Sequence, residues 1–302
     1  MNKIKLFIIL SIIFLILIGI VSYFLLFKKQ AKPPGVPPSP LPVGKLVSVD
    51  FLPRRILFPT LIDKKIIYQD AQSGNLNQID LTNKKISILM EGEKIPPLER
   101  LSLSPMSTKA LLLGYQTSGL VQYSLLDLKT QNITLLNQSI KTAVFVSEEK
   151  IVYQYLDKEK GINNLSIADP DGKNWKKIID LKEETIFLNT LGTGEIVYTS
   201  SETTERFNVI KTDGSGKRTI KLPIPVNINK IAWSSDGKSI IAAVREENKT
   251  TDTFYKINIE TGQKQEIKYQ SQTPINAINL MLTKDAKTLY FTSDDYLYKL
   301  EF

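Results

Sequence analysis

The chain has 302 residues, 42% of them hydrophobic, a formal net charge of +8, and neither cysteine nor histidine. The absence of these two residue types excludes disulfides, Ser-His-Asp or Cys-His catalytic machinery, and zinc sites built on thiolate or imidazole ligands. A bound metal would need oxygen ligands, which favours calcium or magnesium, and a general acid or base would have to be Asp, Glu, Lys or Tyr.

The excess positive charge is concentrated at the N-terminus. The first 42 residues hold five lysines and no acidic residue, so 34 basic and 31 acidic residues remain from residue 43 onward. This remainder is close to neutral and lacks the strong basic excess of a nucleic-acid-binding domain. We therefore expect no nucleic-acid partner, and we expect the N-terminal lysines to meet anionic lipid headgroups.

A long apolar run follows a short tail of residues 1–5. It covers the 22 residues Leu6–Phe27 and would measure about 33 Å as a helix, enough to cross a bilayer core. A cleaved signal peptide is the alternative, but its apolar core is usually only about 7–15 residues long and is followed by small residues. Here Lys28-Lys29-Gln30 follows. The sequence predicts a transmembrane anchor over residues 6–27, with the lipid bilayer as its partner.

The charges on the two sides of this anchor are nearly balanced, with slightly more lysine after it than before it. The positive-inside rule therefore does not settle the orientation. A short tail before the anchor and a long folded domain behind it are typical of a signal-anchor whose N-terminus is cytoplasmic. We expect a single-pass protein of a bacterial cytoplasmic membrane with its folded domain outside the cytoplasm.

Residues 28–42 are predicted to be a proline-rich linker. Six of the 13 residues from Gln30 to Pro42 are proline, which favours extended polyproline II at about 3.1 Å per residue. Such a linker would hold the following domain about 30–40 Å from the bilayer. A ligand for a proline-binding module is the alternative, but a spacer fits the position beside the membrane better.

From residue 43 to residue 302 the chain repeats a unit of short apolar strands and tight polar turns. Period-2 alternation and β-branched residues dominate this region. The second strand of the unit recurs every 40 to 49 residues, at Lys65–Tyr68, Ala110–Leu113, Ile151–Tyr153, Ile196–Tyr198, Ser239–Ala242 and Thr288–Phe291. A strand-built repeat of this length, present in six copies, predicts an all-β, six-bladed β-propeller.

The sixth unit is one strand short. Its predicted third strand, Tyr296–Leu300, has no fourth strand after it, whereas an unassigned strand, Leu46–Asp50, precedes the first unit. Pairing these two strands would remove two exposed sheet edges. We predict that the N-terminal strand closes the ring.

One turn carries a resemblance to a known family. Trp233-Ser234-Ser235-Asp236-Gly237-Lys238 resembles the WSPDGK turn of the TolB-like, WD40-like propeller repeats of bacterial envelope proteins, with Ser235 in the proline position. Degenerate copies lie at residues 103–109 and 282–287, and residues 169–172 and 212–214 match the second turn of the family. The resemblance covers about residues 46–302 and implies an envelope propeller, but no site residue of the family maps onto the chain. Hairpin chemistry accounts for the Asp and Gly of these turns, and Trp233 is expected to pack between blades.

Acidic residues offer two chemical alternatives to a structural role. Asp169, Asp171 and Asn174 resemble the start of a calcium loop, but the twelfth position is Asp180 in place of the required Glu, and the flanking segments read as strands. The pairs Asp294-Asp295 and Glu246-Glu247 are either catalytic carboxylates for glycoside hydrolysis or exposed loop charges. We favour the structural role in each case and predict neither a cofactor nor a metal site.

Four tyrosines recur at matching positions of the second strands: Tyr68, Tyr153, Tyr198 and Tyr290. They would either line an aromatic funnel for glycans or peptides or pack between neighbouring blades. Packing is the favoured interpretation.

The longest polar inserts between second and third strands are residues 202–206 and 246–252. Such inserts lie on one rim of a propeller, where ligands usually bind. The candidate ligand-binding residues are Glu202, Glu205, Arg206, Glu246 and Glu247. We expect a non-enzymatic binding or scaffold module for a protein, peptide or envelope glycan. The alternatives are a metal-assisted, carboxylate-based hydrolase or lyase and a structural subunit of an envelope complex.

Overall fold

The computed structural model describes residues 43–49, 52, 55–116, 119–294 and 296–302. The contacts divide the chain into Met1–Pro40 and a compact unit, Leu41–Phe302, and only the second contains described residues. The predicted tail, anchor and linker lie outside the described residues. Among the residues that are described, no helix is long and apolar enough to span a membrane.

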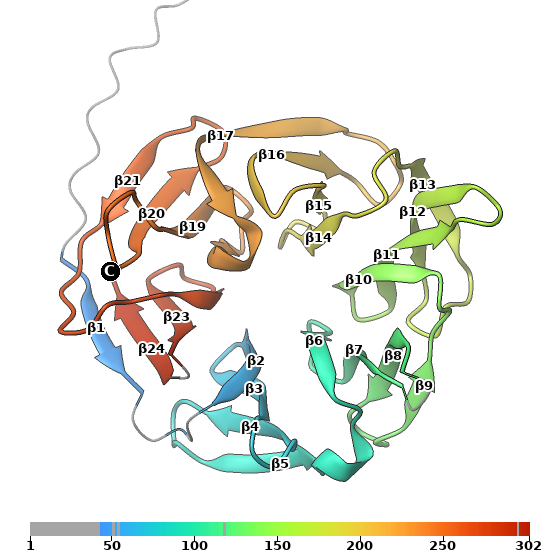
Figure 1. The fold of residues 1–302 in the computed structure, drawn as a ribbon, viewed down its shortest axis with the longest axis horizontal. Helices are drawn as coiled ribbons and strands as arrows, with labels where there is room; N and C mark the ends of the chain where they lie inside the picture. The colour runs from blue at the N-terminus through green and yellow to red at the C-terminus, as the bar shows by residue number, and fades with distance from the viewer. Residues whose placement is uncertain (1–42, 50–51, 53–54, 117–118, 295) are drawn as a thin grey trace, which may run out of the picture. The chain divides into compact units, whose positions relative to one another are not determined.

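The described residues of the compact unit form six antiparallel sheets of four strands each, arranged as a ring (Figure 1). This confirms the predicted all-β, six-bladed propeller. The first three blades, inner strand first, are β2–β5 (Ile56–Ile62, Lys65–Asp70, Leu76–Asp80, Ile86–Met90), β6–β9 (Leu98–Leu103, Lys109–Tyr115, Val121–Asp127, Ile133–Leu135) and β10–β13 (Ile140–Ser147, Lys150–Asp157, Ile162–Ala168, Lys176–Asp180). The last three are β14–β17 (Phe187–Thr190, Ile196–Thr199, Thr203–Ile210, Arg218–Asn227), β18–β21 (Ile231–Trp233, Ser239–Val244, Thr253–Asn258, Lys264–Ile267) and β22–β24 (Ile278–Leu282, Thr288–Ser293, Tyr296–Glu301) with β1 (Lys45–Ser48). Two short 3-10 helices, Gly92–Lys94 and Ile228–Lys230, connect blades.

The N-terminal strand closes the ring, as predicted. β1 runs antiparallel to β24, with Lys45 opposite Glu301 and Ser48 opposite Tyr298, and Figure 1 shows the two side by side in blue and red. The side chain of Leu46 packs into the core between the fifth and sixth blades. The backbone N–H of Gly44 donates a hydrogen bond to the carbonyl of Lys268 at 2.6 Å, which ties the closing strand to the fifth blade as well.

The hydrophobic core lies mainly at the interfaces between blades. Trp233 of the fifth blade meets Phe207 of the fourth edge-on, with ring centroids 5.5 Å apart, so its predicted packing between blades is confirmed. The four matching tyrosines, Tyr68, Tyr153, Tyr198 and Tyr290, are between 0% and 8% exposed. Burial raises the pKa of each phenol. These rings are part of the core and do not line a funnel.

Turns between first and second strands connect neighbouring blades on one face of the ring. In the fifth blade Asp236 accepts hydrogen bonds from Ser234 Oγ at 2.6 Å and from the N–H of Lys238 at 3.0 Å, as hairpin chemistry predicts. Ser235 Oγ donates to the carbonyl of Lys284 in the sixth blade at 2.9 Å. Lys284 in turn forms an ion pair with Asp63 of the first blade at 2.5 Å. We call this side of the ring the turn face.

Candidate functional site

The face opposite the turn face carries the connections between second and third strands and the connections between blades. This follows from the antiparallel order within each blade, because successive connections alternate between the two ends of the strands. We call it the loop face. The sequence predicts that the candidate ligand-binding residues lie on this face.

The predicted insert at residues 202–206 is mostly strand, so the expectation of a loop is wrong there. β17 continues beyond Leu222 to Asn227 and pairs with the start of β16, where Thr203 lies opposite Asn227. Glu202 stays at the edge and accepts hydrogen bonds from the side-chain amides of Asn227 and Asn229, at 3.2 and 3.0 Å. Glu205 and Arg206 are exposed on β16, and their side chains have no hydrogen-bond or ion-pair partner among the described residues.

Glu246 and Glu247 do lie in a loop, between β19 and β20. Glu246 forms an ion pair with Lys249 at 2.6 Å and accepts a hydrogen bond from the phenol of Tyr255. Burial and the Glu246 carboxylate together raise the pKa of Tyr255 to about 12. Glu247 is exposed and has no side-chain partner within the described part of the chain.

The five predicted residues therefore do not form one cluster. In the described residues no hydrogen bond or ion pair joins the pair in the fifth blade, Glu246 and Glu247, to Glu202, Glu205 or Arg206 in the fourth. The loop face of these two blades instead contains a buried carboxylate that sequence reasoning missed, Asp252. Its side chain is fully buried and forms ion pairs with Lys230 at 2.7 Å and Arg245 at 3.1 Å.

The Asp252 network joins the connections on either side of the fifth blade. The carboxylate also accepts a hydrogen bond from the N–H of Ala277 at 2.8 Å, and the phenol of Tyr269 donates to the Asp252 carbonyl at 2.6 Å. Both carboxylate oxygens thus have partners from the protein itself. This arrangement fixes loops and leaves no free group for a ligand.

The acidic residues of the calcium-like turn are likewise satisfied internally. Asp169 forms an ion pair with Lys150 at 2.5 Å and accepts a hydrogen bond from Asn174 at 2.6 Å, and these two contacts lower the pKa of Asp169. Asp171 accepts from the N–H of Lys173 at 3.0 Å. Across the described residues, no three Asp or Glu side chains gather in an arrangement that would hold a metal ion. Asp295 lies outside the described residues.

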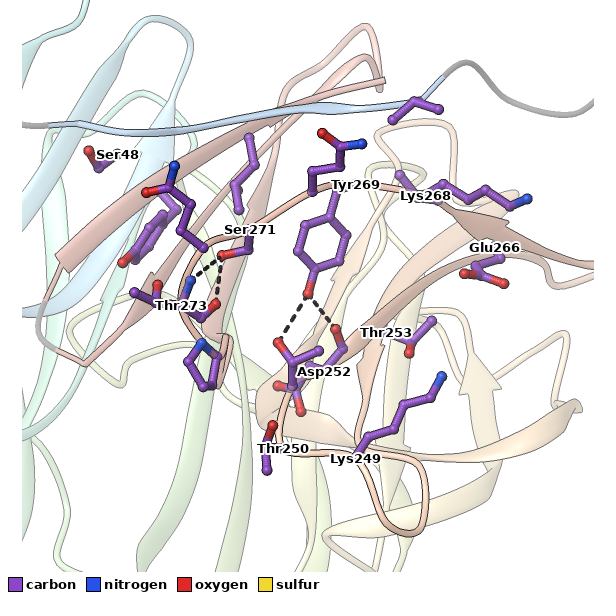
Figure 2. Close-up of a pocket in the computed structure, with 18 residues that line it drawn as sticks. Ser48, Lys249, Thr250, Asp252, Thr253, Glu266, Lys268, Tyr269, Ser271 and Thr273 are labelled. Atoms are coloured by element: carbon purple, nitrogen blue, oxygen red, sulfur yellow. Dashed lines mark hydrogen bonds between the residues drawn. The ribbon is translucent and has the colours of Figure 1, made fainter.

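A groove of about 1360 Å³ lies at the outer edge of the ring, between the fifth and sixth blades. Its walls are the loop before β20, residues 266–274, and the closing strand β1 with Tyr298 of β24. Figure 2 shows Tyr269 reaching from one wall toward Asp252 on the other, and the hydrogen bond of Ser271 Oγ to the Thr273 carbonyl at 2.6 Å. The groove follows the seam at which the ring closes, and it exceeds the range of about 300–1,000 Å³ usual for small-molecule pockets.

A second hollow lies at the loop-face ends of the inner strands. It consists of two adjoining pockets of about 510 and 260 Å³, which share Arg100, Leu101 and Asn229, and we call it the axial site. Two of the β-bulges that border the larger pocket lie at Leu57–Thr60 of β2 and Ile278–Met281 of β22.

Each of these bulges contains a residue with positive φ, Phe58 at 50° and Asn279 at 52°. Asparagine tolerates this conformation, whereas a bulky phenylalanine adopts it rarely and at a cost of about 1–3 kcal/mol. Bulges redirect side chains and are frequent beside binding sites. The strained backbone therefore marks the axial site as the functional candidate on the loop face.

Arg100 lies at the centre of the axial site and lines both pockets. Its side chain is partly buried, and its guanidinium has no hydrogen-bond or ion-pair partner among the described residues. Among the described residues that line the smaller pocket, Arg100 is the single charged one. No sequence signal distinguishes this arginine from the other basic residues, because only the fold brings it to the ring axis.

The larger pocket is lined by acidic as well as basic residues. Glu99 and Asp294 line it together with Arg100, Asn279 and Thr292. Asn279 Nδ2 donates to Thr292 Oγ1 at 3.1 Å, which connects the bulge of β22 to the end of β23. The axial site thus combines one cationic pocket with one that also carries carboxylates.

Comparisons with known proteins agree on the fold. Neither a protein-family model nor a curated protein sequence matches the chain. Among solved structures, it is similar to an oligogalacturonate lyase in complex with manganese (14% identity, TM-score 0.51, 80% of this chain and 75% of that one). It is also similar to TolB from Acinetobacter baumannii (13%, 0.50, 82% and 64%) and to a chain of a mitotic checkpoint complex (9%, 0.52, 88% and 96%). At these identities the likeness shows the fold alone, and it agrees with the β-propeller that the described residues form.

Proposed function

We propose that the chain is a non-enzymatic binding propeller, tethered to the outer side of a cytoplasmic membrane, whose partner or ligand enters the axial site from the loop face. The observation that carries this proposal is Arg100, a partly buried guanidinium without a protein partner between two pockets. A cation in such a place costs desolvation energy that a bound acceptor would offset. The partner is a protein, a peptide or an envelope polymer.

The tether is supported by the sequence of residues 6–27 and by the proline-rich residues 28–42. Protease treatment of intact spheroplasts tests its orientation. We expect release of a fragment of about residues 43–302, because the linker would be accessible and a packed propeller resists cleavage. Full protection in intact spheroplasts, with cleavage only after the membrane is permeabilised, would overturn the extracytoplasmic placement.

Crosslinking in native membranes followed by mass spectrometry tests the binding role. Asn229→Tyr would fill the wall shared by both axial pockets, and Asn229 is exposed, so the ring can accommodate the change. We expect this variant to lose the wild-type crosslinks and a matched variant on the turn face, Glu149→Gln, to keep them. Equal crosslinks from both variants would show that the partner does not use the axial site.

The same crosslinking experiment bears on the structural-subunit alternative. Recovery of one stoichiometric partner would favour it.

A metal-assisted hydrolase or lyase is the second candidate. It rests on Glu99 and Asp294, the two carboxylates that line the larger axial pocket. Oxygen ligands of this kind suit calcium or magnesium. A melting temperature raised by several degrees with either ion, and abolished by Asp294→Asn, would favour the enzyme. If the propeller is a non-enzymatic binding module, we expect neither calcium nor magnesium to change its melting temperature.

A further inference from the structure

We propose that the smaller axial pocket binds a single carboxylate group carried by an apolar or aromatic body. This inference rests on the proposed binding function and names the chemistry of its ligand. The sources of such a group are the C-terminal residue of a peptide and a small free carboxylic acid. The pocket lies between the inner strands of the second, third, fourth and fifth blades.

The charge of the pocket selects a monoanion. Arg100 is the one charged residue among those that line it, and no described residue neutralises its guanidinium. A guanidinium presents donors in a planar fork that matches a carboxylate with two parallel hydrogen bonds. A phosphate monoester carries about −1.5 to −2 charges and is usually held by several cations or by a row of N–H groups. One arginine in a neutral pocket therefore fits a carboxylate better than a phosphate.

The same pocket contains a second hydrogen-bond donor. Asn189 at the start of the fourth blade lines the same pocket, and its Oδ1 accepts a hydrogen bond from the N–H of Thr190 at 2.8 Å. That contact occupies the amide oxygen and leaves the Nδ2 group of Asn189 as a donor. Arg100 and Asn189 both offer N–H groups, which a carboxylate, an acceptor at both oxygens, can satisfy.

The remaining walls are largely apolar. They include the side chains of Val144, Phe187, Phe207, Ile228, Ile231 and Trp233. Such side chains favour an aromatic or branched aliphatic body by area burial, at about 25 cal/mol per Å². The volume of about 260 Å³ lies below the usual range of about 300–1,000 Å³ for ligand pockets. It suits one residue or one small acid and is too small for an extended chain.

The primary test compares two probes of similar size that differ only in whether they end in a carboxylate or a neutral amide. N-acetylphenylalanine and N-acetylphenylalanine amide are titrated into the full-length chain in detergent by calorimetry or ligand-observed NMR. We expect the acid to bind and the amide to bind at least tenfold more weakly. Equal affinity for the two probes, or no binding of the acid at millimolar concentration, would overturn the proposal. Inorganic phosphate binding as tightly as the acid would overturn it as well.

Two substitutions test whether the acid binds in this pocket. Arg100→Gln removes the cation, and Asn189→Asp adds a negative charge beside it; each is expected to weaken binding of the acid at least tenfold with an unchanged melting temperature. Lys221→Gln is the matched control, because it removes an exposed cation of the fourth blade whose side chain has no partner in the described residues, and it should change the affinity less than twofold. Binding that survives both pocket substitutions would show that the acid sits elsewhere.

A longer probe distinguishes the C-terminus of a peptide from a small free acid as the source of the carboxylate. Acetyl-Ala-Ala-Phe with a free C-terminus should bind at least as tightly as N-acetylphenylalanine if the natural ligand is a peptide terminus, and more weakly if it is a small acid.

The proposed binding function and the carboxylate assignment can be contradicted by different results. If Asn229→Tyr abolishes the membrane crosslinks while the acid does not bind, the axial site is a binding site and the carboxylate assignment is wrong. If the crosslinks persist in Asn229→Tyr, the proposed function itself is wrong.

Discussion

Ser104 of the second blade donates a hydrogen bond to Glu148 of the third blade at 2.9 Å. The same carboxylate accepts from the N–H of Met106 at 2.9 Å and from the hydroxyl of Thr108. In the corresponding turns of the fifth and sixth blades an aspartate within the turn, Asp236 or Asp285, accepts equivalent bonds. The second blade lacks this aspartate, and the neighbouring blade supplies a carboxylate in its place.

Glu148→Gln should therefore destabilise the ring and change its pH dependence. Burial favours the protonated acid, but the hydrogen bonds from Thr108, Met106 and Ser104, with Lys109 nearby, outweigh burial and hold the pKa of Glu148 below 4.5. A group whose folded-state pKa is lowered contributes stability that is complete above its unfolded pKa and is lost as the pH falls through the folded value.

At pH 7 we expect a loss of about 1–3 kcal/mol for Glu148→Gln, because charge-assisted hydrogen bonds are replaced by weaker ones. The difference from wild type should shrink as the pH falls below 4.5, which urea unfolding at several pH values would measure. Glu149→Gln, at the exposed neighbouring position, is the control and should be nearly neutral. A difference that stays constant down to pH 3 would contradict this role.

Removal of β1 should weaken the entire propeller. The matched pair is a fragment of residues 43–302 and a fragment of residues 50–302, which differ by the closing strand. Loss of the buried part of Leu46 and of the β1–β24 hydrogen bonds should cost about 3 kcal/mol. For a unit of this size that corresponds to a melting temperature lower by about 6–12 °C. Equal melting of the two fragments by calorimetry would show that β1 does not close the ring.

Asp252→Asn should be among the most damaging single changes. The carboxylate is fully buried between Lys230 and Arg245, and its neutralisation leaves both cations without a counter-charge. Breaking a buried pair in this way costs about 3–5 kcal/mol. Glu247→Gln, in the same loop but exposed, is the control and should stay within about 0.5 kcal/mol of wild type. Chemical unfolding of both variants would measure the difference, and similar values for the two would contradict the structural role of Asp252.

Gly192→Ala tests the contact between the fourth and fifth blades on the turn face. A Cβ atom at Gly192 would lie 1.9 Å from the carbonyl oxygen of Ser235, so one of the two blades would have to move. Gly161→Ala is a useful comparison, because its Cβ would meet no atom within 4 Å although its φ is +65°. We expect the first variant to lose at least about 3 kcal/mol and the second about 1–2 kcal/mol. The reverse order in thermal unfolding would rule out this contact as a constraint.

The strands could be predicted from the sequence because apolar and polar residues alternate along each of them. Residues 203–206 were misjudged because the strand that pairs with them, the end of β17, contains Pro223 and Pro225 and reads as a loop. Arg100 and Asp252 could not be found in advance, since their environments are built by residues far apart in the chain. Glu148 did leave a signal: the turn at residues 103–109 lacks the aspartate of its homologous copies, which implies that another residue supplies the missing carboxylate.

The attachment of the preceding chain to β1 has a mechanical consequence. Tension transmitted through residue 43 acts first on the hydrogen bond between Gly44 and Lys268, and then on a ladder of four residue pairs that begins where Lys45 lies opposite Glu301. Under load this strand would peel from β24 pair by pair, and because β1 also forms one wall of the groove in Figure 2, that groove would open at the same time. Pulling a single molecule from its N-terminal side should show this peeling as an early step at low force, ahead of the rupture of the other five blades.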